Sequence, residues 1–300
     1  MIHIDDEPFR RITDQLIANS QQEQAVRADE VFQPANQKNR ALVDQVIQIL
    51  MQPASRIVGY EHLQELYRRA QAGESCLLLS EHYSNFDIPC LFVLAEQQEG
   101  GKAITDSVVA MAGSKLNEES RFVLAFTEAF TRIVIYPARA LAAVEGKAEF
   151  DEIRDRARNM NRSALREMIR VKNSGHIVLL FPAGTRYRAD KPESRSVLLE
   201  TDSYIKGFKN ILFVGIAGNT LQVNPSGDME KDIPTKDVMV YTISPVISSR
   251  EFRDSARRGV PEGADEGKRA VARAVEAKLM EMHQHAEEIR APLLATLDQE

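Results

Sequence analysis

The residues best suited to chemistry in this chain are His82 and Asp87, which lie within the stretch CLLLSEHYSNFDIPC at 76–90. The apolar run Cys76–Ser80 predicts a short buried strand, and the apolar residues after Asp87 predict a helix to about Ala95. His82 therefore follows the end of a strand, and this edge of a sheet is where α/β proteins commonly place catalytic groups.

The spacing of the two side chains suits a general base. On one continuous helix, side chains five residues apart would point to different faces. A turn between them lets the aspartate accept a hydrogen bond from one ring nitrogen, which fixes the tautomer and leaves the other nitrogen free to take a proton. A polar turn that only caps a helix would have the same residues, so the spacing alone leaves both interpretations open.

A second strand-end turn follows in the sequence IVLLFPAGTRYR at 177–188. The run Ile177–Phe181 predicts a strand, and a Pro-x-Gly turn with Arg186 and Arg188 comes after it. One guanidinium group can donate two parallel hydrogen bonds to two oxygens of a phosphate, and glycine lets the backbone approach a ligand closely. The stretch predicts a phosphate site, although a solvated loop with ordinary surface charge fits the same composition.

In this order, the two turns resemble motifs of the glycerophospholipid acyltransferase family, which acylates glycerol-3-phosphate or lysophosphatidic acid. The first motif, His-x4-Asp, is matched by His82 and Asp87, and the third, Phe-Pro-Glu-Gly-Thr-Arg, is matched in part by Phe181–Arg186. The second motif, a strand ending in an arginine, has a looser match at Ile133–Arg139, and the fourth, an apolar strand, at Ile211–Ile216. The resemblance covers roughly residues 70–250.

Two positions depart from the family pattern. Ala183 stands where most members carry glutamate, and Gly215 stands where the fourth motif usually has proline. The soluble plastid-type glycerol-3-phosphate acyltransferases also lack that glutamate, and they carry a helical N-terminal domain. The chain therefore resembles that branch more than the membrane-spanning lysophosphatidate branch.

The resemblance implies direct acyl transfer from acyl carrier protein or a CoA thioester to a hydroxyl of glycerol-3-phosphate, in phospholipid biosynthesis. His82 is expected to be the general base and Asp87 to orient it. No cofactor and no metal is expected, and no Cys/His cluster has the spacing of metal ligands. The acceptor phosphate is expected to bind three arginines, Arg186, Arg188 and Arg139. The turn of the third motif is expected to supply an oxyanion site, at Gly184 and Thr185.

Three alternatives remain open. The acceptor can be lysophosphatidate instead of glycerol-3-phosphate. The chain can also be a non-catalytic acyl- or lipid-binding protein of the same fold, an interpretation that Ala183 motivates. Finally, Ser84 or Cys90 near His82 can carry the acyl group covalently, although no Gly-x-Ser-x-Gly elbow is present.

Composition narrows the possible partners and the cellular compartment of the protein. A formal net charge of −6 argues against general nucleic-acid binding. Both cysteines, Cys76 and Cys90, lie in apolar stretches, which favours a reducing compartment over a disulfide framework. The first residues show no signal-peptide pattern, and no uncharged apolar run approaches the ~18 residues of a spanning helix. We therefore expect a cytoplasmic protein that meets a lipid substrate only peripherally, at the inner face of the membrane.

The strands and helices expected around these residues alternate along the chain, which predicts an α/β fold with a mixed, mostly parallel central sheet flanked by helices. Residues 1–72 show helical spacing without strand-like runs, and we expect a small helical N-terminal domain there and an α/β domain with a C-terminal helix at 73–300. The expected strands are 76–80, 108–112, 133–136, 177–181, 211–217 and 238–244. The expected helices are 87–97, 117–130, 150–172, 196–208 and 264–290, the last ending before Pro292.

One predicted helix carries arginines at every fourth position: Arg154, Arg158, Arg162, Arg166 and Arg170. On a helix this spacing forms a slowly winding basic stripe. The stripe could dock an acidic partner or anionic headgroups, and the resemblance implies acyl carrier protein as that partner. A solvated face balanced by neighbouring acidic residues is the alternative.

Overall fold

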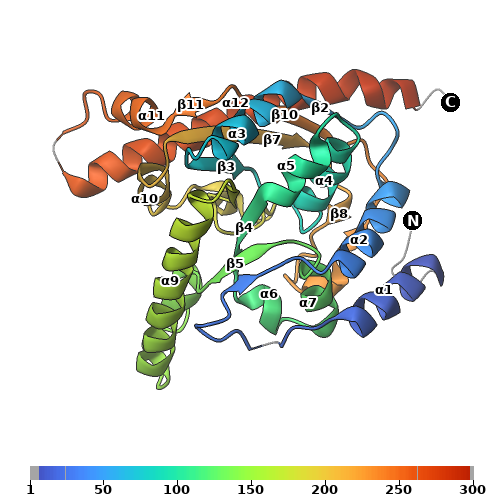
Figure 1. The fold of residues 1–300 in the computed structure, drawn as a ribbon, viewed down its shortest axis with the longest axis horizontal. Coiled ribbons are helices and arrows are strands. Elements are labelled where there is room, and N and C mark those ends of the chain that lie inside the picture. The colour runs from blue at the N-terminus through green and yellow to red at the C-terminus, as the bar shows by residue number, and fades with distance from the viewer. Residues whose placement is uncertain (1–6, 24, 262, 298–300) are drawn as a thin grey trace. The chain divides into compact units, whose positions relative to one another are not determined.

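The computed structural model describes residues 7–23, 25–261 and 263–297, and the chain is α/β as expected (Figure 1). It divides into two compact units. Of the described residues, the first unit holds 47–108 and those of 172–297, and the second holds those of 7–46 together with 109–171. The division therefore does not fall at residue 72, because segments far apart in the sequence contribute to each unit.

The sheet of the first unit positions the predicted histidine turn. Its strand order is β6-β3-β7-β10-β2. The strands are β2 (Arg56–Val58), β3 (Cys76–Ser80), β6 (Ile177–Leu180), β7 (Asn210–Ala217) and β10 (Val240–Ile243). β3 runs parallel to β6 and β7, whereas β10 and the short β11 (Ile247–Ser248) are antiparallel to β7. The two predicted strand-end turns therefore leave the sheet from adjacent strands at the same edge.

Burial explains why these strands read as unbroken apolar runs. Every residue of β3, β6 and β7 is buried. In register, Leu78 lies between Leu179 and Leu212. Parallel strands covered on both faces lack the alternating pattern of half-exposed strands, and this composition made them predictable from the sequence.

The helices of the first unit are α3 (Tyr60–Gln71), α4 (Asp87–Glu96), α5 (Gly101–Ser107), α10 (Thr201–Lys206), α11 (Ser249–Ala256) and α12 (Ala264–Leu297). Two single-turn 3-10 helices are η1 (Pro192–Arg195) and η2 (Met229–Lys231), and β8 (Leu221–Gln222) pairs with β9 (Ile233–Pro234). α12 packs along β7 and β10 (Figure 1). Gly215 makes that approach possible, because a Cβ there would lie 2.4 Å from the backbone carbon of Met282.

α12 is longer than the sequence predicts, since it continues through Pro292 to Leu297. Ile289, Leu293, Leu294 and Leu297 pack against the buried residues Ala217, Val238, Val240 and Ala286. This apolar contact on both sides of the proline offsets the lost backbone hydrogen bond.

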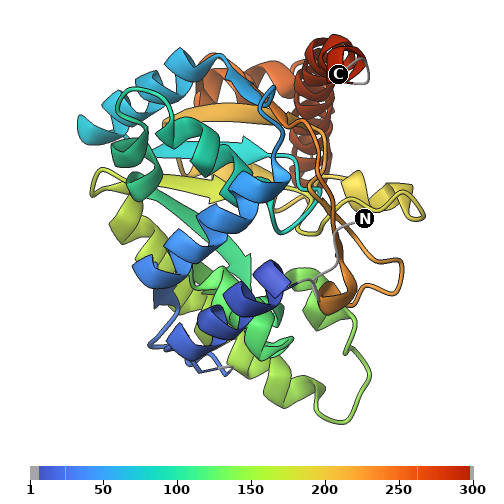
Figure 2. The same cartoon turned by 90° about the vertical axis from the view of Figure 1, so that its right-hand side faces the viewer.

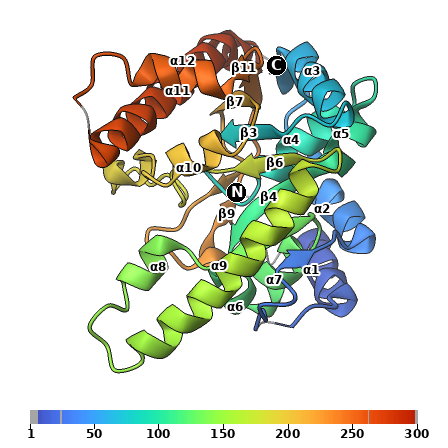
Figure 3. The same cartoon turned by 60° about the vertical axis from the view of Figure 1, so that its left-hand side comes forward.

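The strands of the second unit are β1 (Phe32–Gln33), β4 (Val108–Gly113) and β5 (Arg132–Ile135). β4 begins at the boundary between the units. β4 and β5 are parallel, and β1 is antiparallel to β5. Its helices are α1 (Glu7–Asn19), α6 (Lys115–Glu118), α7 (Arg121–Thr127), α8 (Ala138–Ala142) and α9 (Phe150–Lys172), and α2 (Gln37–Leu50) crosses the unit boundary. α1 packs against α7 (Figures 2 and 3).

Apart from α12, most predicted elements are confirmed within a residue or two, but three more differ. The stretch 1–72 contains the short strands β1 and β2, which are too brief to leave a periodic pattern. The helix predicted over 117–130 is interrupted, because the Ser120 hydroxyl accepts the Val123 N–H at 3.2 Å and caps a new helix. Within 196–208, only α10 is α-helical. No helix among the described residues combines the length and apolar character needed to cross a membrane.

Candidate active site

His82 and Asp87 meet as the sequence predicts. The Nδ1 atom of His82 lies 2.8 Å from Oδ2 of Asp87, and the Asp87 side chain is only 3% exposed. A carboxylate can only accept a hydrogen bond, so Nδ1 carries the proton. No other hydrogen bond to the His82 ring occurs among the described residues, and Nε2 is therefore the free, basic nitrogen.

The backbone holds the Asp87 carboxylate in place before the helix begins. Oδ2 accepts the Tyr83 N–H at 2.6 Å, and the Ser84 N–H lies 3.0 and 3.1 Å from the two oxygens. At the same residue, the buried Tyr241 hydroxyl donates to the Asp87 carbonyl at 2.8 Å. These hydrogen bonds fix the position of the Asp87 carboxylate beside the His82 ring.

The turn after β6 closes against this pair. The Phe181 ring stacks on the imidazole of His82, with ring centroids 3.9 Å apart. The Tyr187 N–H donates to the His82 carbonyl at 2.7 Å. The two strand-end turns thus form one surface, and the imidazole has little freedom to rotate.

Gly184 shapes the second turn. Its φ of 65° lies in the left-handed region that glycine tolerates best, and a Cβ there would lie 2.6 Å from Leu198 Cδ1. Its N–H donates to the Phe181 carbonyl at 2.9 Å. That amide is therefore engaged within the turn, and the oxyanion role predicted at Gly184 and Thr185 stays a prediction. Thr185 is half-buried in the same turn.

The two arginines of this turn already have partners. Arg186 forms an ion pair with Asp232, and the two side chains are 11% and 1% exposed. Arg188 bonds the Asp190 carboxylate at 2.9 and 3.1 Å and also donates to the Pro225 carbonyl. Burial raises the pKa of Asp232, and the Asn224 N–H and Arg186 oppose that rise. The phosphate role predicted for these arginines stays a prediction, and here they tie the β6 turn to a distant loop.

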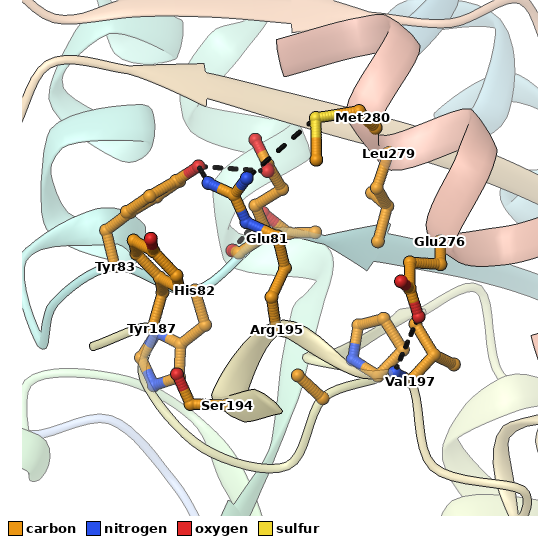
Figure 4. A pocket seen from close by; sticks show the side chains of 13 residues that line it. Glu81, His82, Tyr83, Tyr187, Ser194, Arg195, Val197, Glu276, Leu279 and Met280 are labelled. Carbon is orange, nitrogen blue, oxygen red and sulfur yellow. Dashed lines mark hydrogen bonds between the residues drawn. The ribbon is translucent and has the colours of Figure 1, made fainter. Parts of the chain in front are cut away.

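A pocket opens beside His82, lined by side chains from both turns and from α12 (Figure 4). Its cavity volume is about 30 Å³. Its apolar wall includes Pro182, Ala183 and Leu279, and its polar wall includes Tyr187 and Glu276. A nitrogen base, apolar surface and polar side chains therefore meet around one small pocket, and a substrate larger than a water molecule would lie across its mouth.

Sequence reasoning missed Arg195, which lines the same pocket. It ends the 3-10 helix η1, and its guanidinium carbon lies 4.3 Å from the ring centroid of Tyr187. One of its nitrogens donates to the Tyr83 hydroxyl at 2.7 Å (Figure 4). No motif or periodicity marks this residue in the sequence, because its neighbours come together only through the fold.

A buried network lies beside the His82–Asp87 pair. Glu81 accepts hydrogen bonds from the Tyr83 hydroxyl at 3.0 Å and from the Ile216 N–H at 2.9 Å. His283 on α12 lies with Nδ1 3.4 Å from the same carboxylate and 2.8 Å from the Ile216 carbonyl. The Glu81 carboxylate raises the pKa of His283, and burial opposes that rise.

The candidates for a covalent intermediate are poorly placed for nucleophilic attack. Cys90 is fully buried, and burial raises the pKa of its thiol to about 12. Cys76 is also buried, with a pKa raised to about 11. The thiolate is the reactive form, so neither is a nucleophile near neutral pH. The Ser84 hydroxyl is buried and lies 3.3 Å from the Asp87 carboxylate, which it supports.

The remaining predicted residues lie in the second unit. Arg139 is exposed on the short helix α8. On α9, the outer arginines of the stripe are paired locally, Arg154 with Asp151 at 2.7 Å and Arg170 with Glu167 at 2.8 Å.

Among the described residues, no group of three or more histidine, cysteine, aspartate or glutamate side chains is placed to hold a metal ion. Comparison of the chain with models of known protein families found no match, and comparison with curated proteins found none either.

Proposed function

We propose that the chain transfers a fatty-acyl group from a thioester, on acyl carrier protein or CoA, to a hydroxyl of glycerol-3-phosphate. One observation carries the proposal. A buried, backbone-anchored carboxylate oxygen lies 2.8 Å from Nδ1 of His82, Nε2 has no hydrogen-bond partner among the described residues, and His82 lines a pocket. This arrangement supports a general base, because it fixes both the tautomer and the ring orientation.

The proton path follows from that geometry. Nε2 of His82 takes the proton of the acceptor hydroxyl as its oxygen attacks the thioester carbonyl. When the carbon–sulfur bond breaks, the imidazolium returns the proton to the leaving thiolate. Asp87 stays ionised throughout and stabilises the imidazolium. The raised thiol pKa of Cys90 favours this direct transfer over an acyl-enzyme.

An acceptor screen with purified protein tests the proposal. Acyl-CoA and acyl carrier protein donors are each combined with glycerol-3-phosphate, lysophosphatidate and glycerol, and the acylated product is measured. We expect turnover with glycerol-3-phosphate, whereas preferential turnover of lysophosphatidate would move the acceptor to the other branch of the family. Tight acyl or lipid binding without turnover of any acceptor would favour a non-catalytic binder instead.

A docking site for the acyl donor is proposed on α9 (Figure 3). Arg158, Arg162 and Arg166 are exposed and form no ion pair with the described acidic residues. Leu165 and Ile169 each follow an arginine, Arg162 and Arg166, by three positions, so they lie on the same side of the helix as these arginines. Their exposed fractions are 52% and 45%. Exposed apolar side chains framed by unpaired cations suit an acidic, amphipathic partner such as acyl carrier protein.

Charge reversal on this surface separates a docking role from a solvated face. The variant Arg158→Glu/Arg162→Glu is expected to raise the KM for acyl carrier protein substrates about tenfold while the KM for acyl-CoA changes little. Arg250→Glu on α11, whose side chain is 90% exposed, is the matched control. An unchanged KM for acyl carrier protein substrate in the double variant would remove the docking site from the account.

A further inference from the structure

Arg195 is a positive charge in the pocket that no described carboxylate neutralises in an ion pair. One terminal nitrogen donates to the Tyr83 hydroxyl at 2.7 Å, and the other lies 3.8 Å from the Met280 sulfur. Its Nε is buried and has no hydrogen-bond partner among the described residues. The guanidinium therefore keeps donor capacity that the fold does not use.

Aromatic rings orient this guanidinium without cancelling its charge. Its central carbon lies 4.3 Å from the Tyr187 ring centroid and 5.8 Å from that of Tyr83. Contacts of this kind are weaker than an ion pair and leave the cation available to an anion. A partly buried cation without a counter-ion is costly, so the site favours an anionic ligand.

The two carboxylates of the pocket are engaged elsewhere. Both oxygens of Glu81 accept hydrogen bonds, from the Tyr83 hydroxyl and from the Ile216 N–H. Glu276 accepts the Val197 N–H at 3.4 Å, and it lies across Arg195 from Tyr83 in the view of Figure 4. The Tyr83 hydroxyl links Glu81 to Arg195, because it donates to the carboxylate and accepts from the guanidinium, but among the described residues neither carboxylate forms a direct ion pair with Arg195.

We propose that Arg195 binds the phosphate group of a phosphate-ester substrate in this pocket. The guanidinium offers its unused donor capacity to the phosphate oxygens. Ser194 also lines the pocket, and its hydroxyl accepts the Arg188 N–H at 2.8 Å, which leaves its own hydrogen to donate. Arg186 and Arg188, by contrast, already form ion pairs with Asp232 and Asp190.

The identity of the substrate rests on the proposed acyl transfer. His82 and Arg195 line the same pocket, so a phosphate held by Arg195 at the mouth of this pocket would bring the hydroxyl groups of glycerol-3-phosphate to the side on which the base lies. CoA also carries phosphates, and the experiment separates the two sources.

The test is calorimetric titration of the full chain with inorganic phosphate, glycerol-3-phosphate, glycerol and CoA. Arg195→Gln is expected to weaken binding of inorganic phosphate and glycerol-3-phosphate by about 10- to 100-fold, the usual effect of losing a charge-assisted contact. Arg250→Gln, which removes an exposed arginine from α11, is the matched control and should bind like the wild type. If Arg195→Gln weakens the binding of CoA alone, the phosphate bound at Arg195 belongs to the acyl donor and not to the acceptor.

Two outcomes overturn the inference: wild-type protein that binds none of the phosphates, or Arg195→Gln protein that binds them as tightly as wild type. Circular dichroism checks that the variant is folded. If Arg195→Gln does not fold, Arg195→Lys is measured instead. Lysine keeps the positive charge but lacks the planar guanidinium, so phosphate binding should weaken several-fold. Absence of acyl transfer together with Arg195-dependent phosphate binding would refute the proposed function alone. Normal acyl transfer with unchanged phosphate affinity would refute only this inference.

Discussion

The turns after β3 and after β6 leave adjacent parallel strands, yet they satisfy their charges in different ways. In the first, Asp87 binds His82 and the backbone N–H groups of Tyr83 and Ser84, all within five residues. In the second, Arg186 pairs with Asp232, which lies 46 positions away in the chain, and Arg188 donates to the Pro225 carbonyl, 37 positions away, besides its local pair with Asp190. The His82–Asp87 pair is held by residues of its own turn, whereas the pairing of Arg186 depends on the assembled fold.

This difference predicts different consequences of mutation. Under the proposed function, the locally held His82–Asp87 pair acts in the reaction, and its loss should mainly reduce turnover. Charges matched across the fold are arranged for stability, and their loss should mainly lower the free energy of unfolding.

The largest expected effect comes from Asp87→Asn. The amide cannot hold the Nδ1 proton of His82 as the carboxylate does, so the imidazole takes the wrong tautomer and loses its basic Nε2. We expect kcat for acyl transfer to fall on the order of 10³-fold. Steady-state kinetics with glycerol-3-phosphate measure this effect.

Asp190→Asn is the matched control for Asp87→Asn, because it changes a partly exposed aspartate beside the second turn. It is expected to leave kcat and the Tm unchanged within error. Equal loss of activity in the two aspartate variants would abolish the distinction between the turns.

Next in size is the stability cost of Arg186→Met. This substitution leaves the Asp232 carboxylate, which is 1% exposed, without its cation, and breaking a buried pair typically costs about 3–5 kcal/mol. Arg186→Met/Asp232→Asn should recover much of that loss, because neither partner then remains charged. Denaturant unfolding of both variants gives the two free energies. A single variant as stable as wild type, with only a raised KM for glycerol-3-phosphate, would return Arg186 to the phosphate role that its motif predicts.

The smallest expected effect is a pH dependence contributed by His283 behind the first turn. Its pKa is raised above the ordinary value of 6.5, chiefly by Glu81, so the folded state favours the protonated imidazole. The resulting stabilisation is fully present below pH 6.5 and is lost as pH rises through the raised pKa. His283→Gln should therefore lose more stability relative to wild type at pH 6 than at pH 9. A difference that is independent of pH would show that packing alone accounts for the residue.

The same contrast explains what could be predicted from the sequence. The strands and the His82–Asp87 pair were predictable, because apolar runs and short spacings carry their information locally. Arg195, Glu81 and His283 were not, because they lie on η1, directly after β3 and on α12, and they meet their partners only in the folded chain. The division into two units was also missed, since each unit combines segments that are distant in sequence. The extension of α12 beyond Pro292 depends on its contacts with the sheet, which no local signal reveals.

The most direct test of the account is the rate of acyl transfer to glycerol-3-phosphate by wild-type and His82→Ala protein under identical conditions. His285→Ala is the control, because that histidine is exposed on α12 and lies outside the pocket. We predict that His82→Ala lowers kcat on the order of 10³-fold while His285→Ala leaves it unchanged. A His82→Ala protein that is folded and retains the wild-type rate would contradict the assignment of His82 as the general base.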